Sequence, residues 1–287
     1  MKSGRLESRR NLEKKQTKKG DSLKKRLINK AVNLSGVKAR GLKNALDLKI
    51  REFEWRFPRL PKEADGMRLL HISDTHLDGV PGLLEALLNK LNGLEYDYVC
   101  WTGDFRYDKG KFEAAALEPT LELARFLLKR SRVFAVPGNH DCLQTLKTLE
   151  NEGVEVLLNR GFELQKNFYL AGTDDPHYFR NVDFDAALSD RKPDDFTMAL
   201  VHSPEVVKEA SELKIDFYLC GHTHGGQVCL PWIGIIYWGA RCARRFAGGR
   251  FEIGQMQGYT HKGTGASNSP IRFNCPPEVV VHTLRGE

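Results

Sequence analysis

The feature that most constrains this chain is a series of short apolar segments, each of which stops abruptly at polar, often glycine-bearing residues. Such segments occupy residues 67–73, 96–103, 132–138, 196–203 and 217–223. Runs with helical periodicity stand between most of them, at residues 80–94, 113–130, 142–153 and 204–213. Strands that alternate with helices in this way predict a layered α/β fold.

The remaining elements complete one domain. Further strands are expected at residues 154–159 and 278–284, with a hairpin at residues 162–173. Residues 50–57 alternate apolar and charged side chains, which is typical of an edge strand. Pro119 is expected to start or break the helix that contains it. No internal repeat is visible, so residues 50–287 are predicted to form a single α/β domain.

The N-terminal region differs sharply from this domain in charge. Residues 1–51 hold 17 Lys+Arg and 4 Asp+Glu, a charge of +13, whereas the remaining residues hold 27 and 33, a charge of −6. Residues 1–21 are polar and predicted to be disordered. Residues 22–49 form a basic amphipathic segment, in which Ser35-Gly36 and Gly41 predict two short helices.

A basic N-terminal region of this kind is expected to bind phosphate-rich surfaces, either anionic lipid or nucleic acid. A basic amphipathic helix suits an anionic membrane surface, which residues 1–48 would contact; the alternative is a solvated helix packed on the body. Residues before Phe53 offer no aromatic side chain on which a base could stack, so no nucleic-acid partner is expected. No obligate protein partner is evident either.

The sequence predicts a cytoplasmic protein, held on the inner face of the membrane if its leader binds lipid. No run of about 18 apolar residues is present, and the N-terminus lacks the apolar core of a secretory signal. The six cysteines are scattered without a CxxC pair, which predicts reduced thiols.

The polar residues that follow the predicted strands are of one chemical kind. They are Asp74 and His76, Asp104 and Asp108, then Asn139, His140 and Asp141, then His202, and finally His222 and His224. In an open α/β sheet, ligands bind outside the carboxyl ends of the strands. A single Asp-x-His or a glycine-rich turn is weak evidence, but five such strand ends in series predict one shared site.

These residue types favour a metal centre. None of the candidates is a cysteine, which disfavours a closed structural zinc site. Mixed aspartate, asparagine and histidine ligands suit Mn²⁺, Fe or Zn²⁺ in an open catalytic site. The candidates are too many for one ion, and two divalent ions that share a carboxylate serve hydrolysis at phosphorus.

Five motifs in this order, "SDTHLD", "GDFRYD", "GNHD", "LVHSP" and "GHTHGG", resemble those of the calcineurin-like metallophosphoesterase superfamily over roughly residues 66–287. The resemblance implies an α/β fold in which a two-layer β-sandwich is flanked by helices and carries a di-metal centre at the strand ends. It also implies that one metal is held by Asp74, His76 and His224, the other by Asn139, His202 and His222, with Asp104 bridging them.

The same resemblance implies supporting roles. His140 would be the acid for the leaving group or a contact to the phosphate, and Asp108 and Asp141 would orient ligands through hydrogen bonds. Three residues separate Asp104 from Asp108, where many members have two. Arg106, within this motif, is either a contact to a substrate phosphate or a surface arginine.

Residues 231–238 are apolar and aromatic, and Arg241, Arg244 and Arg245 follow them. Such a segment suits a membrane interface or an acyl-chain groove, or else an ordinary strand packed in the body. His261, Gly263 and Gly265 are predicted to form a loop near the site.

The stretches "LPKEADGMRLLHISDTHLD" and "GTGASNSPIRFNCPPEVVV" are similar to those of a bacterial subgroup with membrane-associated members, some of which cleave the pyrophosphate of UDP-2,3-diacylglucosamine. This similarity implies a lipid-linked phosphodiester or pyrophosphate as the substrate. Three alternatives stay open: a nuclease or cyclic-nucleotide phosphodiesterase, a phosphoprotein phosphatase, and a non-catalytic scaffold. All seven candidate ligand positions are filled, which argues against the scaffold.

Overall fold

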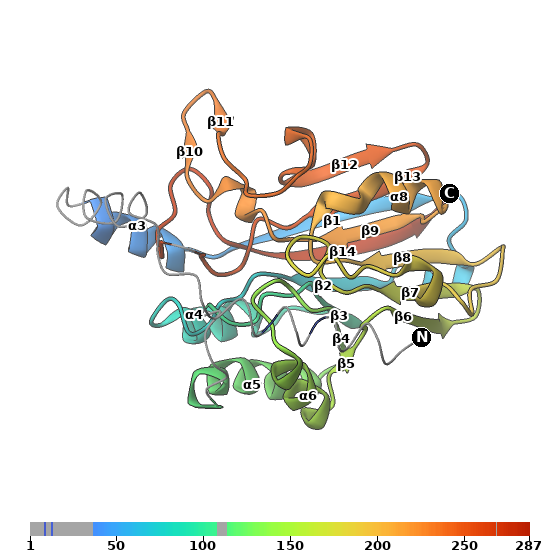
Figure 1. The fold of residues 1–287 in the computed structure, drawn as a ribbon, viewed down its shortest axis with the longest axis horizontal. Helices are drawn as coiled ribbons and strands as arrows, with labels where there is room; N and C mark the ends of the chain where they lie inside the picture. The colour runs from blue at the N-terminus through green and yellow to red at the C-terminus, as the bar shows by residue number, and fades with distance from the viewer. Residues whose placement is uncertain (1–8, 10–12, 14–36, 108–113, 268) are drawn as a thin grey trace.

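A computed structural model describes residues 9, 13, 37–107, 114–267 and 269–287, and its framework is a sandwich of two six-stranded sheets (Figure 1). In spatial order the first sheet contains β1 (Lys49–Phe57), β14 (Glu278–Gly286), β2 (Arg68–Ile72), β3 (Tyr98–Trp101), β4 (Arg132–Ala135) and β5 (Glu155–Val156). The second contains β12 (Gly249–Ile253), β13 (Met256–Thr260), β9 (Phe217–Cys220), β8 (Phe196–Leu200), β7 (Phe168–Gly172) and β6 (Arg160–Gln165). The predicted two-layer sandwich is confirmed.

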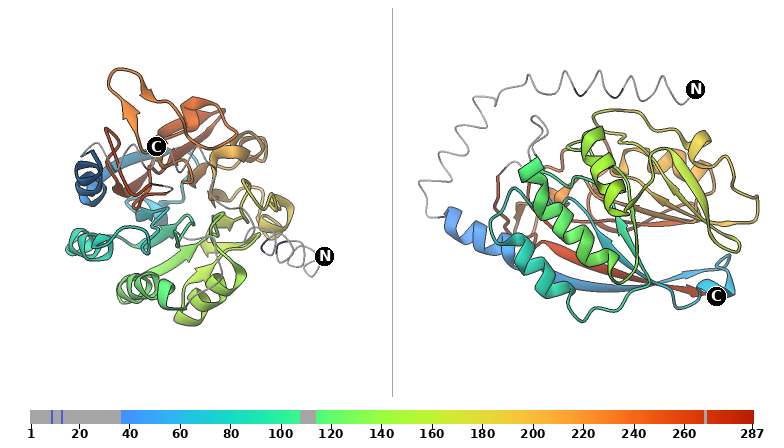
Figure 2. Two further views of the ribbon diagram at one scale, coloured as in Figure 1. Left: turned by 60° about the vertical axis from the view of Figure 1, so that its left-hand side comes forward. Right: turned by 90° about the horizontal axis from the view of Figure 1, so that it is seen from below.

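Helices cover the outer faces of both sheets (Figures 1 and 2). The first sheet carries α3 (Val37–Leu46), α4 (Leu83–Leu91), α5 (Ala114–Leu128) and α6 (Leu143–Glu152). The second carries α7 (Phe184–Ala187) and α8 (Val207–Glu212). Single 3-10 turns are η1 (Lys62–Ala64), η2 (Pro204–Val206), η3 (His224–Gly226) and η4 (Arg244–Phe246). None of these helices, within the described ranges, is long and apolar enough to cross a bilayer.

The space between the two sheets is filled by apolar side chains that both layers contribute. The largest are Trp55, Phe57, Phe134, Phe168, Phe196, Phe217 and Tyr259. A second apolar core, rich in leucine, lies between the first sheet and its helices. The central strands are therefore buried on both faces, which explains why they read as continuous apolar runs.

Pro119 lies inside α5 and neither starts nor breaks it, so the expectation for this residue was wrong. Proline removes one backbone donor from a helix. The apolar face of α5 offsets that loss, because Leu123, Ala124 and Leu127 are all fully buried against the sheet.

Gly41 likewise does not end α3, which runs through it. A Cβ at this position would lie 2.6 Å from the Cβ of Ile271, so the helix packs closely against residues 271–273. The rest of the predicted amphipathic segment and the leader lie outside the described residues, apart from Arg9 and Glu13. Arg9 is buried and donates a hydrogen bond to the carbonyl of Asp141.

A chain of buried hydrogen bonds crosses the first sheet behind the strand ends. Trp55 Nε1 donates to His282 Nδ1 at 2.9 Å, His282 Nε2 lies 3.2 Å from His71 Nδ1, and His71 Nε2 lies 2.9 Å from Thr102 Oγ1. Because indole can only donate, each imidazole must carry its single proton on Nε2. The chain is thus fully satisfied when both imidazoles are neutral.

This chain predicts acid sensitivity. Burial first, and then neighbouring imidazoles, hold the pKa of His71 and of His282 well below its ordinary value of 6.5. The unfolded protein binds these protons near pH 6.5 and the folded protein does not, so stability is lost as the pH falls below 6.5. In urea titrations of chelator-treated protein, the two imidazoles should lower the free energy of unfolding by about 3 kcal/mol between pH 7.5 and pH 5.5.

The matched control for this prediction is His282→Gln. Its amide can accept from Trp55 and donate to His71 without titrating, so over the same pH range the variant should lose about 1.4 kcal/mol less stability than the native chain. Equal losses in the variant and the native chain would show that the acid sensitivity arises elsewhere.

Candidate metal centre

The carboxyl ends of strands from both sheets meet at one rim of the sandwich. Strands β2, β3 and β4 run parallel in the first sheet, and β7, β8 and β9 run parallel in the second. The two sheets are joined at this rim, because the backbone N–H of His222 donates to the carboxylate of Asp74 at 2.9 Å. All seven residues predicted as ligands lie there.

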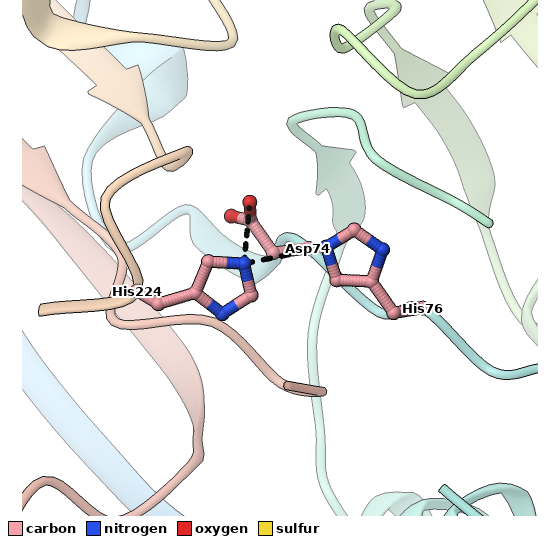
Figure 3. Close-up of side chains that lie close together, drawn as sticks. All are labelled: Asp74, His76 and His224. Carbon is pink, nitrogen blue, oxygen red and sulfur yellow. Dashed lines mark hydrogen bonds and ion pairs between the residues drawn. The ribbon is translucent and has the colours of Figure 1, made fainter. Parts of the chain in front are cut away.

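The first group of side chains contains Asp74 and His76, which follow β2, and His224, which follows β9, and the three point toward one another (Figure 3). His224 Nε2 lies 3.3 Å from Asp74 Oδ1 and 3.3 Å from His76 Nε2. All three residues are buried. The three candidate ligand atoms face a common point.

The second group contains Asn139, His202 and His222. His202 Nε2 lies 3.2 Å from Asn139 Oδ1 and 3.2 Å from His222 Nδ1. Asp104, His202 and His222 also satisfy the spacing expected of three ligands to one ion. The two histidines of "GHTH" therefore lie in different groups, His224 in the first and His222 in the second.

Asp104 lies between the two groups and turns one oxygen toward each. Its Oδ2 is 3.6 Å from His76 Nε2, and its Oδ1 is 3.5 Å from His202 Nε2. A carboxylate in this position can bind two cations at once, which is the arrangement found in di-metal hydrolytic sites.

Backbone carbonyls fix the orientation of three of the imidazoles. The Nδ1 atoms of His76, His140 and His202 lie 2.6, 2.6 and 2.7 Å from the carbonyls of Arg106, Tyr107 and Thr102. A carbonyl can only accept, so each Nδ1 carries a proton and donates. The lone pair of each neutral ring is then on Nε2, directed into the centre, as a metal ligand requires.

The backbone of the centre is strained. Asp74, His76, Asp104, His222 and His224 all have φ between 40° and 72°. This left-handed region costs residues other than glycine on the order of 1–3 kcal/mol each, and such strain gathers at functional sites. Five of the seven predicted ligands are held in this way by their surroundings.

Two glycines allow the strand ends to approach each other. A Cβ on Gly221 would collide with Ser73 and with the carboxylate of Asp74, and one on Gly138 would collide with the side chain of Asp104. The glycine before "HTH" therefore makes room for an aspartate from the other sheet.

The ionisation states of the side chains in the centre favour the binding of a cation. Burial opposes ionisation of Asp104, but His140 and His202 hold the pKa of its carboxyl well below the ordinary value. Burial alone would lower the pKa of His202, yet the carboxylate of Asp104 raises it to about 10. Burial and neighbouring imidazoles lower the pKa of His222 and His224 well below 6.5.

The donor set therefore fits divalent metal ions. Two carboxylates, an amide oxygen and neutral imidazoles are the ligand types that Mn²⁺, Fe and Zn²⁺ accept. A bound divalent cation would neutralise the carboxylate of Asp104 in place of the charged His202 imidazole. His202 would then lose its proton.

The residues predicted for supporting roles have different positions. Asp141 accepts hydrogen bonds from the backbone N–H groups of Asp104 at 2.7 Å and Phe105 at 3.0 Å, so it shapes the turn that carries the bridging carboxylate. Arg106 is buried, which excludes a surface arginine, and its carbonyl orients His76. Asp108 lies outside the described residues.

A neighbouring group was not predicted. His177 stacks against His222 with ring centroids 4.1 Å apart, and its Nδ1 lies 2.7 Å from Glu205 Oε1. Arg241 forms an ion pair with the same carboxylate at 2.6 Å. His177 follows the end of β7 within "GTDDPH", which is the same pattern of a strand stopping at polar residues that marked the candidate ligands.

The loop of residues 261–265 packs behind the centre, as predicted. The N–H of Gly265 donates to the carbonyl of Asp74 at 2.9 Å, and a Cβ on Gly263 would lie 2.7 Å from His224 Nδ1. Arg272, which is fully buried and was not singled out in the sequence, places Nη2 3.3 Å from the same Nδ1. Together they support the first group from behind.

Comparison with known proteins agrees with this geometry. The model of the calcineurin-like phosphoesterase family matches residues 67–226, more than half of the chain and all seven predicted ligands. The chain is 26% identical to the metallophosphoesterase YkuE of Bacillus subtilis over 79% of this chain and 82% of that one. It is 31% identical to the phosphodiesterase YaeI of Escherichia coli over 53% and 57%. It is 23% identical to the UDP-2,3-diacylglucosamine pyrophosphatase LpxG of Chlamydia muridarum over 82% and 88%.

Proposed function

This chain belongs to the calcineurin-like phosphoesterase family and is a metal-dependent phosphohydrolase, and we propose that it cleaves a phosphodiester or pyrophosphate bond with two divalent ions. Asp74, His76 and His224 would hold one ion, Asn139, His202 and His222 the other, and Asp104 both. Mn²⁺ is the ion we expect, with Fe or Zn²⁺ as substitutes. The observation that carries this proposal is the carboxylate of Asp104, which turns one oxygen toward each group.

When bound, the ions would supply an activated water and neutralise charge on the phosphoryl oxygens. The chain itself would supply the proton for the leaving oxygen. His140 lies at the edge of the centre, with Nε2 3.8 Å from Asp104 Oδ2. Its Nδ1 donates to Tyr107, so a proton given to the leaving oxygen would come from Nε2, the ring nitrogen that faces the centre.

For the substrate we propose a lipid-linked phosphodiester or pyrophosphate such as UDP-2,3-diacylglucosamine. Support comes from LpxG of Chlamydia muridarum, whose name gives this activity and which the chain matches over most of both lengths. YaeI, named as a phosphodiesterase, supports diester chemistry more broadly. Attachment of the protein to an anionic membrane, first predicted for residues 1–48, would bring it to such a substrate.

A chelation experiment tests the metal dependence. Treatment with a chelator followed by gel filtration should abolish hydrolysis of bis-p-nitrophenyl phosphate, and Mn²⁺ should restore it, because the ions would supply the activated water. Metal analysis should find two ions per chain. Undiminished hydrolysis by metal-free protein would contradict the proposal.

Three substrates compared on the Mn²⁺-loaded protein separate the bond types: bis-p-nitrophenyl phosphate, p-nitrophenyl phosphate and UDP-2,3-diacylglucosamine. We expect turnover of the diester and the lipid pyrophosphate. Hydrolysis of the monoester alone would reject the proposed bond type. Hydrolysis of the diester without the lipid pyrophosphate would leave the nuclease or cyclic-nucleotide alternative in its place.

A further inference from the structure

Exposed large hydrophobic side chains are concentrated in one short segment. The described residues expose seven of them, and six lie within ten positions: Val228, Leu230, Trp232, Ile233, Ile236 and Tyr237. The segment contains β10 (Cys229–Leu230) and β11 (Gly234–Ile235), which pair as a two-stranded hairpin. It stands out from the body in Figures 1 and 2, on the same side as α3. We call residues 228–237 the apolar hairpin.

Anchoring hydrogen bonds hold the apolar hairpin in a conformation that exposes its apolar side chains. Its base is held by the N–H of Cys229, which donates to the carbonyl of Phe273 at 2.9 Å, and its turn by Arg244, which donates to the carbonyl of Ile233. Ile235 is half-buried on the inner side, while Trp232 is fully exposed and Tyr237 is 76% exposed. Exposed apolar patches on a well-anchored element mark interaction sites.

The sequence around the apolar hairpin is basic. Residues 227–251 contain four arginines and no acidic residue. Arg241 is paired with Glu205, but the other three arginines are exposed. The exposed charges of α3, Lys38, Arg40 and Lys43, are also basic, and α3 packs on the same residues 271–273 that anchor the hairpin.

We propose that the apolar hairpin is a membrane-docking element that inserts into the surface of an anionic lipid bilayer. Tryptophan and tyrosine favour the headgroup region, aliphatic side chains enter the acyl boundary, and nearby lysine and arginine bind anionic lipid. Self-association would instead bring two basic surfaces together, which repel. The charge therefore selects an anionic lipid surface as the partner.

Docking would also place the metal centre at the membrane. The hairpin follows directly after η3, which carries His224, and a Cβ on Gly226 would lie 2.8 Å from Ile235 Cγ2. The proposed docking depends only on the apolar hairpin and its basic neighbours. That a lipid-linked substrate then reaches the centre rests on the proposed function.

Tryptophan fluorescence of the full chain tests the docking. Trp55 and Trp101 are buried and Trp238 is half-buried, so Trp232 dominates any change in exposure. Vesicles that contain phosphatidylglycerol should shift the emission to shorter wavelength, and lipids brominated in their acyl chains should quench it. Vesicles of phosphatidylcholine alone should bind at least about tenfold more weakly, because the basic charges then have no partner.

Two variants, each checked by thermal melting, complete the test. Trp232→Ser with Ile233→Ser should weaken sedimentation with anionic vesicles by at least about tenfold, because two apolar side chains leave the interface. Ile50→Ser is the matched control, since Ile50 is the remaining exposed large hydrophobic residue and lies on β1. It should bind like the native chain.

Several outcomes would overturn the docking. One is sedimentation with anionic vesicles without quenching by brominated lipid, which would assign binding to the basic leader. Another is a dimer that dissociates in the Trp232→Ser variant, which would make the hairpin a contact between two copies. Hydrolysis of bis-p-nitrophenyl phosphate by the native protein without vesicles tests the proposed function separately, so either proposal can fail alone.

Discussion

Replacing Asp104 by alanine is expected to abolish hydrolysis and to release metal from both groups of ligands. One carboxylate oxygen lies near His76 and the other near His202, so a single substitution removes a ligand from each group. Loss of both ligands should reduce the turnover of bis-p-nitrophenyl phosphate on the order of 10⁴-fold or more, because the residues of such a centre act as a unit. Metal analysis of the purified variant should find fewer than one ion per chain.

Two controls give this result its meaning. Asp194→Ala removes an exposed aspartate from a loop and should leave both metal content and turnover unchanged. Asp104→Asn retains the shape and one coordinating oxygen, and should lie between the native chain and Asp104→Ala. If Asp104→Ala kept two ions, the carboxylate would not bridge them, and the assignment of ligands to two groups would have to be abandoned.

The candidate ligands could be identified in the sequence because their residue types and their positions point to the same conclusion. Each follows an apolar strand, and parallel strands deliver their carboxyl ends to one rim. What the sequence does not contain is the conformation that these residues adopt. Asp74, Asp104 and His222 have positive φ and are held by contacts with residues distant in the sequence, such as the bond from the N–H of His222 to Asp74, so motif spacing does not reveal this conformation.

His177 was missed although its signal was present. It follows β7 as the candidate ligands follow their strands, but β7 was expected only as part of a hairpin at residues 162–173 and not as a parallel strand whose end reaches the shared rim. Arg272 had no such signal. Its burial behind His224 depends on a long-range approach of the loop after β13, which neither periodicity nor motif spacing reveals.

The hairpin of β12 and β13 could have been predicted. The two strands are separated by two residues, Gly254 and Gln255, and Gly254 has φ of 59°. A two-residue loop that begins with glycine is a recognised hairpin signal. The apolar hairpin differs, because its composition suits both a buried strand and a membrane surface. Only its position outside the packed core excludes the buried strand.

Replacing His140 by alanine is expected to slow hydrolysis while both ions stay bound. Loss of a proton donor typically costs about 10²–10⁴-fold in turnover. His140 could instead be a metal ligand, since one atom each of His140, His76 and Asp104 lie close enough together to bind one ion. The side chain of His140 is 10% exposed whereas those of His76 and His202 are fully buried, and this position at the open edge of the centre favours the proton donor.

The choice of leaving group separates these roles. p-Nitrophenolate can leave without a proton, whereas an alkoxide needs one. In an alkyl p-nitrophenyl diester, His140→Ala should therefore slow cleavage of the P–O bond to the alkyl group more than cleavage of the P–O bond to the p-nitrophenyl group. Added imidazole should restore part of the lost turnover of the poor leaving group. Metal analysis supplies the deciding control. A variant that has lost an ion would place His140 among the metal ligands. A variant that cleaves both bonds more slowly by the same factor would place it among the phosphate contacts, because only a proton donor discriminates by the basicity of the leaving group.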